Sequence, residues 1–181
     1  MTATTFTYPN VTFRVTHEAT AGDQAKTANG LELREANWAP TTLTTIKVEQ
    51  GTTTQQIFLY WEPPSTQPEF HLAFVPETCV LFLGGGRFSA SVDLQNMQLI
   101  HQHEVELLWD FQFVKGFLVE LGESECFLHR PDGTLVGSAS VDSPYEIREQ
   151  DDGVEFVSTN QSSPKILFAS APTTAESEEL F

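Results

Sequence analysis

The sequence predicts an all-β protein made of antiparallel β-meanders, arranged as a partial propeller or as a sandwich, with little helix. Three observations predict this class. Apolar and polar side chains alternate along most of the chain, a meander-like unit repeats in its second half, and Phe (14 residues) and Thr are abundant. Alternation with a period of two is typical of half-buried strands, and aromatic or β-branched side chains suit a pleated surface.

The N-terminal part contains four segments that we interpret as strands, each bounded by Gly, Pro or Thr-rich residues that favour turns. Apolar residues alternate with polar ones at 11–16, 31–34 and 46–48, and they form a short continuous run at 57–61. Residues 104–114 approach the 3.6-residue stripe of a helix, but they fit a strand equally well. We therefore expect strands throughout.

A repeat organises the second half of the chain. Residues 80–100 and 117–136 share a Leu-Gly pair, Leu83-Gly84 in the first copy and Leu121-Gly122 in the second, followed by apolar residues at matching positions. Each copy has the pattern strand, Gly-containing turn, strand, Asp-containing turn, strand, and a truncated third copy begins at Gly153. The sequence therefore predicts a three-stranded meander that recurs after about 37 residues.

The turns of this repeat point to a known family. The first copy has Asp93-Leu-Gln-Asn-Met97 at its turn, and the second has Asp132-Gly133-Thr134. Over residues 78–158 the units resemble the blades of quinoprotein-type (PQQ-like) β-propellers, although both copies lack the Trp that closes the following strand in that family. The resemblance implies blade-like meanders. Because a closed propeller needs about four to eight blades, we expect an open arrangement of two or three units.

The expected organisation is a single all-β domain at residues 1–169, with N-terminal strands at 1–75 and the meander repeats at 78–158. Residues 170–181 are polar and acidic and show no periodicity. Such a segment is typical of a disordered, solvated tail, since it has too little apolar surface to offset the entropy of ordering. The alternative is that its last two residues, Leu180-Phe181, dock on a partner.

Charge and composition argue against several classes of function. Twenty-five acidic residues and nine basic ones give a net charge of −16, which argues against a nucleic-acid or anionic-membrane partner. No apolar run reaches the length of about 18 residues that spans a membrane, and the first residues do not resemble a signal peptide. Cys79 and Cys126 lie among apolar residues, so we expect buried, unbridged thiols in a reducing, cytoplasmic compartment.

His101 and His103 form a compact pair of ligand-type side chains that would point to the same face of a strand. A metal would need further ligands, with His129 or Glu125 as the candidates. We expect no metal and no other cofactor, and we interpret the pair as a polar row, with a pH-sensitive contact as the alternative. Residues 84–86 are three glycines without the Gly-Lys-Ser/Thr of a phosphate-binding loop, so we expect a turn or a bulge.

Catalytic residues are not expected, because no familiar nucleophile motif occurs. Acidic pairs such as Glu120 with Glu123, or Asp142 with Glu146, leave a carboxylate-dependent hydrolase open as an alternative.

Aromatic side chains supply the candidate binding surface. Phe111 and Phe113 share one face of a predicted strand, and Asp110 and Gln112 share the other. Together with Trp109 and Trp61, these two Phe residues are the bulky side chains that we expect to contact a partner.

The function that fits these observations is a non-catalytic, acidic interaction module with a basic protein as its partner. A β-barrel or sandwich that binds a small apolar ligand is a second hypothesis, and the hydrolase is a third. Open sheet edges favour pairing between chains, but the charge of −16 opposes self-association. We expect a monomer at low salt.

Overall fold

The computed structural model describes residues 3–20, 30–35, 40–62, 69–158 and 163–168. All regular elements among these residues are β-strands, and all strand pairs but one are antiparallel. The predicted all-β class with antiparallel meanders is therefore confirmed. In these ranges no helix is long and apolar enough to cross a membrane. The predicted tail at 170–181 lies outside the described residues.

The first sheet contains five strands in the order β1-β2-β4-β5-β3. Its side chains alternate as the sequence predicts: in β2, Phe13 and Val15 are buried while Arg14 between them is exposed. The sheet is antiparallel except where β3 pairs with β5. The strands are β1 (Ala3–Tyr8), β2 (Val11–Ala19), β3 (Leu31–Arg34), β4 (Thr42–Gln50) and β5 (Thr53–Trp61).

The second and third sheets are four-stranded meanders in which neighbours in sequence are neighbours in the sheet. The second sheet contains β6 (His71–Val75), β7 (Val80–Gly85), β8 (Phe88–Asp93) and β9 (Gln98–Glu104). The third contains β10 (Leu108–Val114), β11 (Phe117–Gly122), β12 (Glu125–His129) and β13 (Leu135–Ser140).

The fourth sheet is shorter, with strands in the order β14-β15-β16. These are β14 (Tyr145–Glu149), β15 (Gly153–Ser158) and β16 (Lys165–Leu167). Equivalent strands begin at Val80, Phe117 and Gly153, so the unit recurs after 37 and then 36 residues. The structure thus contains the repeat that the sequence predicts, including its truncated third copy.

Each repeat unit has one strand more than the sequence predicts. β6, which we placed among the N-terminal strands at 1–75, pairs with β7 across a turn at residues 76–79. β10, which begins in the segment with the ambiguous period, pairs with β11 across Lys115 and Gly116. Both of these turn residues have positive φ, 48° and 82°, which is the backbone of a type I′ hairpin. The tight turn, rather than the hydrophobic pattern, fixes the first strand of the third sheet.

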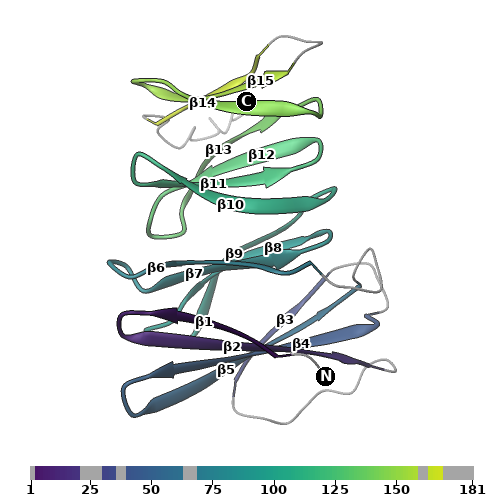
Figure 1. Cartoon of the computed structure of the whole chain (residues 1–181), viewed down its shortest axis with the longest axis vertical. Helices are drawn as coiled ribbons and strands as arrows, with labels where there is room; N and C mark the ends of the chain where they lie inside the picture. Colours follow the sequence, from purple (N-terminus) through teal and green to yellow (C-terminus); the bar gives the residue numbers. More distant parts are fainter. Residues whose placement is uncertain (1–2, 21–29, 36–39, 63–68, 159–162, 169–181) are drawn as a thin grey trace, which may run out of the picture.

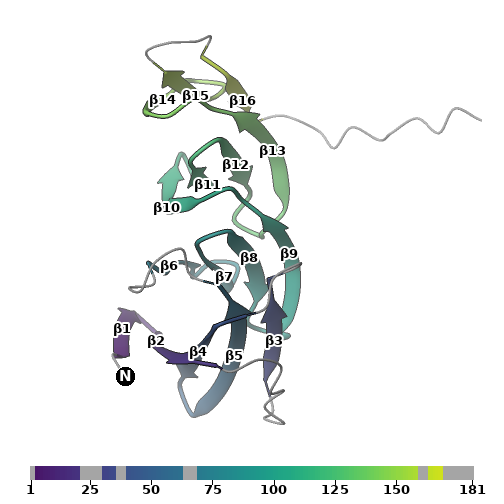
Figure 2. The ribbon, with the colours of Figure 1, turned by 90° about the vertical axis from the view of Figure 1, so that its right-hand side faces the viewer.

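The four sheets stack on one another in an open row (Figure 1). The first strands of the sheets, β1, β6, β10 and β14, lie along one side of the row, and β3, β9 and β13 lie along the opposite side (Figure 2). We call the side that carries the first strands the first-strand face. Because the row does not close into a barrel, every sheet keeps two edge strands.

Hydrophobic layers between successive sheets hold the row together. The largest lies between the first and second sheets and includes Phe13, Trp61 and Phe74, and a second lies between the third and fourth sheets around Leu128 and Phe156. The layer between the second and third sheets divides into two smaller apolar clusters. This junction also holds the buried polar groups described below.

The glycine run at residues 84–86 ends β7 and begins the turn to β8. Gly86 has a φ of 57°, a left-handed conformation that glycine adopts without strain. A Cβ added at Gly85 would lie 2.9 Å from the ring of Trp61. The run therefore serves turn formation and close packing, as predicted.

Candidate functional site

A cluster of three histidines and one glutamate lies at the junction between the second and third sheets. His101 and His103 come from β9, Glu120 from β11 and His129 from β12. The two β9 residues are separated by one position and share a face, and their ring centroids lie 4.9 Å apart. The sequence predicted this shared face and named His129 as a candidate partner. It did not indicate that Glu120 would contact both His103 and His129.

Glu120 joins two of the histidines. Its Oε1 lies 3.0 Å from Nε2 of His103, and its Oε2 lies 3.3 Å from Nε2 of His129. Glu120 and His129 are each only 1 % exposed. Burial raises the pKa of this carboxyl group, but the hydrogen bonds and positive charges of His103 and His129 outweigh burial and hold its pKa at about 2. Glu120 is therefore an ionised group between two sheets.

The other ring nitrogens of these histidines are unpaired. Nδ1 of His103, Nδ1 of His129 and Oγ of the neighbouring Ser91 are buried and have no hydrogen-bond partner among the described residues. Since Nε2 of each ring faces a carboxylate oxygen, Nε2 carries the proton in the neutral form. The junction therefore contains three buried polar atoms that no described residue pairs with.

The cluster includes residues that the sequence offered as candidate metal ligands. His129, one of the two candidate additional ligands, does lie near His101, with 6.2 Å between ring centroids. Even so, no three His, Cys, Asp or Glu side chains in the described part of the chain are arranged to hold a metal ion. The chemistry available here is charge pairing and proton uptake. Burial, followed by the charges of His103 and His129, lowers the pKa of His101.

Three of the four residues predicted to form an aromatic binding surface lie on β10. This strand pairs only with β11 among the described residues, so it is an edge strand on the first-strand face. Phe113 is 51 % exposed. Phe111 is half-buried and lies 6.2 Å from the ring of Phe82, while Trp109 stacks on Tyr145 at 5.4 Å. Trp109 and Phe111 therefore pack against other aromatic rings, whereas the side chain of Phe113 is exposed to solvent.

Trp61, the fourth residue of the predicted surface, does not belong to it. Its side chain is 0 % exposed, and its indole Nε1 donates a hydrogen bond to Oγ1 of Thr44 at 2.8 Å. β5 lies between β4 and β3 inside its sheet, and its last residues are buried on both faces. The apolar run 57–61 is therefore core, and the Trp61 prediction is corrected.

A carboxylate lies beside the aromatic residues of β10. Oδ1 of Asp110 accepts a hydrogen bond from the backbone N–H of Phe111 at 2.8 Å and lies 3.3 Å from Nδ1 of His71 on β6. Asp110 itself is exposed. The contact with His71 crosses from the second sheet to the third, and the sequence pattern contained no indication of it.

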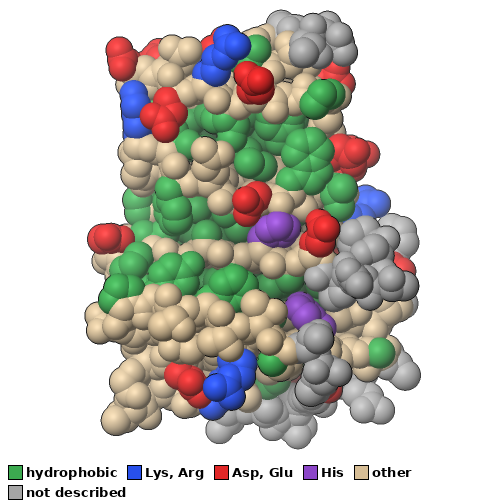
Figure 3. Space-filling view, viewed as in Figure 1, with side chains coloured by type: hydrophobic (Ala, Val, Ile, Leu, Met, Phe, Trp, Pro, Cys, Tyr) green, Lys and Arg blue, Asp and Glu red, His purple; other side chains and the backbone are tan. Residues whose placement is uncertain are grey.

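The first-strand face combines apolar and acidic side chains over a wide area. Figure 3 shows hydrophobic side chains gathered in bands across the middle of this face, with Asp and Glu beside and between them and few Lys or Arg. Among the large hydrophobic residues of the described first strands, Phe113 is the one with an exposed side chain.

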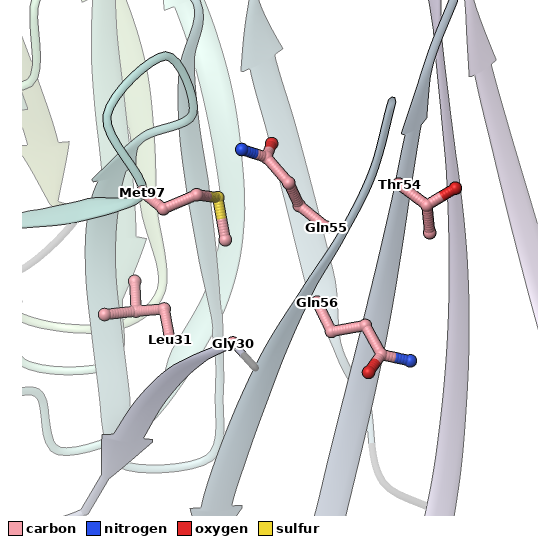
Figure 4. Close-up of a pocket in the computed structure, with 6 residues that line it drawn as sticks. All are labelled: Gly30, Leu31, Thr54, Gln55, Gln56 and Met97. Atoms are coloured by element: carbon pink, nitrogen blue, oxygen red, sulfur yellow. The ribbon is translucent and has the colours of Figure 1, made fainter. Parts of the chain in front are cut away.

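A hollow of about 470 Å³ lies beside β3 and β5 of the first sheet. It is lined by Gly30, Leu31, Thr54, Gln55, Gln56 and Met97. Gln55 points toward Met97, whereas Thr54 and Gln56 point to the other side of β5 (Figure 4). The described residues of its lining include no titratable side chain and no Trp or Phe.

The acidic pairs proposed for hydrolysis have other surroundings in the structure. Glu120 is engaged by two histidines, whereas Glu123 is exposed. Glu146 lies 4.0 Å from Arg148 on the surface of β14. Glu146 lines a hollow of about 310 Å³ together with Arg148, and Asp142 is not among the described residues that line it.

Comparison with known proteins adds no assignment. No family model matches the chain, and a search of curated proteins finds no relative.

Proposed function

We propose that the protein is a non-catalytic interaction module that binds a basic protein partner through its first-strand face. The observation that carries the proposal is β10, an edge strand among the described residues that carries a half-exposed Phe113 and the exposed carboxylate of Asp110. Aromatic side chains provide much of the binding energy at protein interfaces. Phe113 is therefore the side chain of β10 that is best placed to contact a partner.

The charge of the middle of the molecule supports a basic partner. Residues 69–140, which form the second and third sheets, contain ten acidic and three basic residues. Like charges at a contact cost several kcal/mol, whereas complementary charges steer partners together and accelerate association. An acidic partner would meet a repulsive field over this face.

The scaffold suits a module of this kind. In the proposal, the meanders are blade-like units of the quinoprotein type, stacked in a row that holds β10 on a rigid support. The module acts in the reducing, cytoplasmic compartment, which agrees with the free thiols of Cys79 and Cys126.

Photo-crosslinking from β10 tests the proposal. A photoreactive phenylalanine analogue replaces Phe113 in the full chain, and in a control chain it replaces Leu99, an exposed residue of the opposite edge strand β9. The captured protein is identified, purified, and titrated against the wild-type chain at about 0.05 and 0.5 M NaCl, where screening lengths differ severalfold.

The expected result is a basic protein that crosslinks from position 113 but not from position 99, with an affinity that falls as salt rises. Capture of an acidic protein, or an affinity that does not respond to salt, would overturn the proposal. If an apolar dye binds saturably and no protein displaces it, the result would instead favour the small-ligand hypothesis.

A further inference from the structure

We propose that β10 recognises its partner by strand addition: an extended segment containing Lys or Arg pairs with the open edge of β10 and lengthens the third sheet. The inference rests on the proposed function and specifies the part of the partner that is bound. In this mode of recognition, main-chain hydrogen bonds provide affinity and side chains on alternate positions provide specificity.

The backbone of β10 is oriented for this role. The N–H of Phe111 lies outside the ladder to β11, because it donates to the carboxylate of Asp110. In an antiparallel strand the outward N–H and C=O groups recur at every second residue, so those of Phe113 face the same way as those of Phe111. The edge therefore offers a row of main-chain groups next to the aromatic side chains.

Two of the other first strands, β6 and β14, are less suitable. β6 is an edge strand, but three of its five residues are buried. β14 has only five residues, and its Glu146 and Arg148 form an ion pair on its surface. β10 combines seven residues, an open edge and an exposed Phe113. Among the three it is the strand best suited to an added partner.

Charge complementarity selects a basic segment. Asp110 lies on the edge itself, and Glu106 is exposed just before β10 begins. Beyond the other end, Asp151 is exposed and pairs with Lys115 at 3.6 Å. A strand added along β10 would therefore pass the carboxylates of Glu106 and Asp110, whereas Lys115 offsets the charge of Asp151. The same charges, together with the net charge of −16, repel a second copy of this chain as the occupant.

The incoming segment also changes the role of Asp110. The carboxylate now occupies the outward N–H of Phe111. An added strand supplies a backbone carbonyl to that N–H, and the released carboxylate then meets a Lys or Arg side chain of the segment. The positive charge of the segment compensates for the lost hydrogen bond, whereas a neutral or acidic segment provides no such compensation.

Three synthetic peptides test the inference against the full-length chain. The first has about ten residues and alternates Lys with Val, a pattern that forms strands. The second replaces every Lys by Glu. The third keeps the Lys–Val sequence but is N-methylated at alternate residues, which removes the donors of one edge without changing charge. Binding is measured by fluorescence anisotropy, and amide hydrogen exchange locates the bound site.

The Lys–Val peptide is expected to bind, to slow exchange of the Phe113 amide, and to leave β9 unchanged. N-methylation, Phe113→Ser and Asp110→Asn should each weaken binding by about tenfold or more, since each removes a central contact. The matched control is Leu99→Ser on β9, an edge strand of the second sheet on the opposite side of the row. This variant should bind as the wild type does. Unchanged melting of Phe113→Ser shows that the loss is not one of folding.

The contrary outcomes separate the two proposals. Equal binding of the N-methylated peptide would overturn strand addition and leave the basic partner standing. Equal binding of the Glu–Val peptide would overturn the basic partner as well. Protection of β10 that grows with protein concentration in the absence of peptide would identify a second copy of the chain as the occupant, and strand addition by a partner would be wrong.

Discussion

Glu120 connects the second and third sheets because its carboxylate is shared by His103 and His129. We predict that Glu120→Gln lowers the free energy of unfolding by about 3 kcal/mol, since the variant loses two buried contacts to an ionised carboxylate, and hydrogen bonds to charged groups contribute about 1.5–3 kcal/mol. Urea denaturation measures the change. The control Glu123→Gln alters an exposed acid nearby and should cost no more than about 0.5 kcal/mol. Equal effects of the two variants would show that the buried pair adds nothing.

The same cluster predicts how stability depends on pH. Glu120 has a pKa of about 2 in the folded chain and an ordinary value of 4.5, so its contribution is complete above pH 4.5 and is lost between pH 4.5 and 2. The pKa of His101 is lowered from its ordinary 6.5, so the stability it confers is present above pH 6.5 and declines as the pH falls.

Urea titrations at a series of pH values check both ranges. Glu120→Gln should make the decline in stability below pH 4.5 shallower, and His101→Gln should flatten the decline below pH 6.5. A wild-type chain that gains stability on acidification would contradict this account of the cluster.

Part of this cluster was predictable at the level of single residues. The spacing of His101 and His103 gives a shared face in any strand. The contacts of Glu120 with His103 and His129 were not predictable. In the sequence, Glu120 lies 17 positions from His103 and 9 positions from His129, and alternation alone does not show which strands of different sheets face each other. Trp61 was misplaced because an apolar run ending near Pro residues fits both a surface edge and a buried strand.

At the scale of elements, β5 and β10 both carry aromatic residues but differ in role. Trp61→Ala, in the core strand β5, should lower the free energy of unfolding by about 4 kcal/mol through lost burial and a cavity. Phe113→Ser, on the edge strand β10, should change it by no more than about 0.5 kcal/mol. Thermal and urea denaturation provide both values. A large loss of stability in Phe113→Ser would mean that this side chain belongs to the core.

The strands themselves were largely predictable because alternation of polar and apolar residues has a period that only strands share. The 37-residue recurrence also identified β7, β8 and β9 with β11, β12 and β13. The first strand of each unit escaped this reasoning. β6 has buried residues in succession, and β10 has an irregular register at Leu108 and Asp110, so neither shows a clean alternation.

At the scale of the whole molecule, the open row leaves sheet edges that other proteins cover or close. The charge of −16 opposes pairing of these edges between copies, and the range of that repulsion shortens from about 30 Å at 0.01 M salt to about 3 Å at 1 M. We predict a monomer at low salt and a modest shift toward dimer as salt rises. Light scattering across this range measures the mass, and a tight dimer at low salt would contradict the prediction.

Hydrogen exchange on the complex with the purified, crosslink-identified partner tests the central claim most directly. The account predicts that partner binding slows amide exchange along β10, and most at Phe113, while amides of β3, β9 and β13 on the opposite side of the row exchange as in the free chain. Protection confined to that opposite side, with β10 unchanged, would contradict the account.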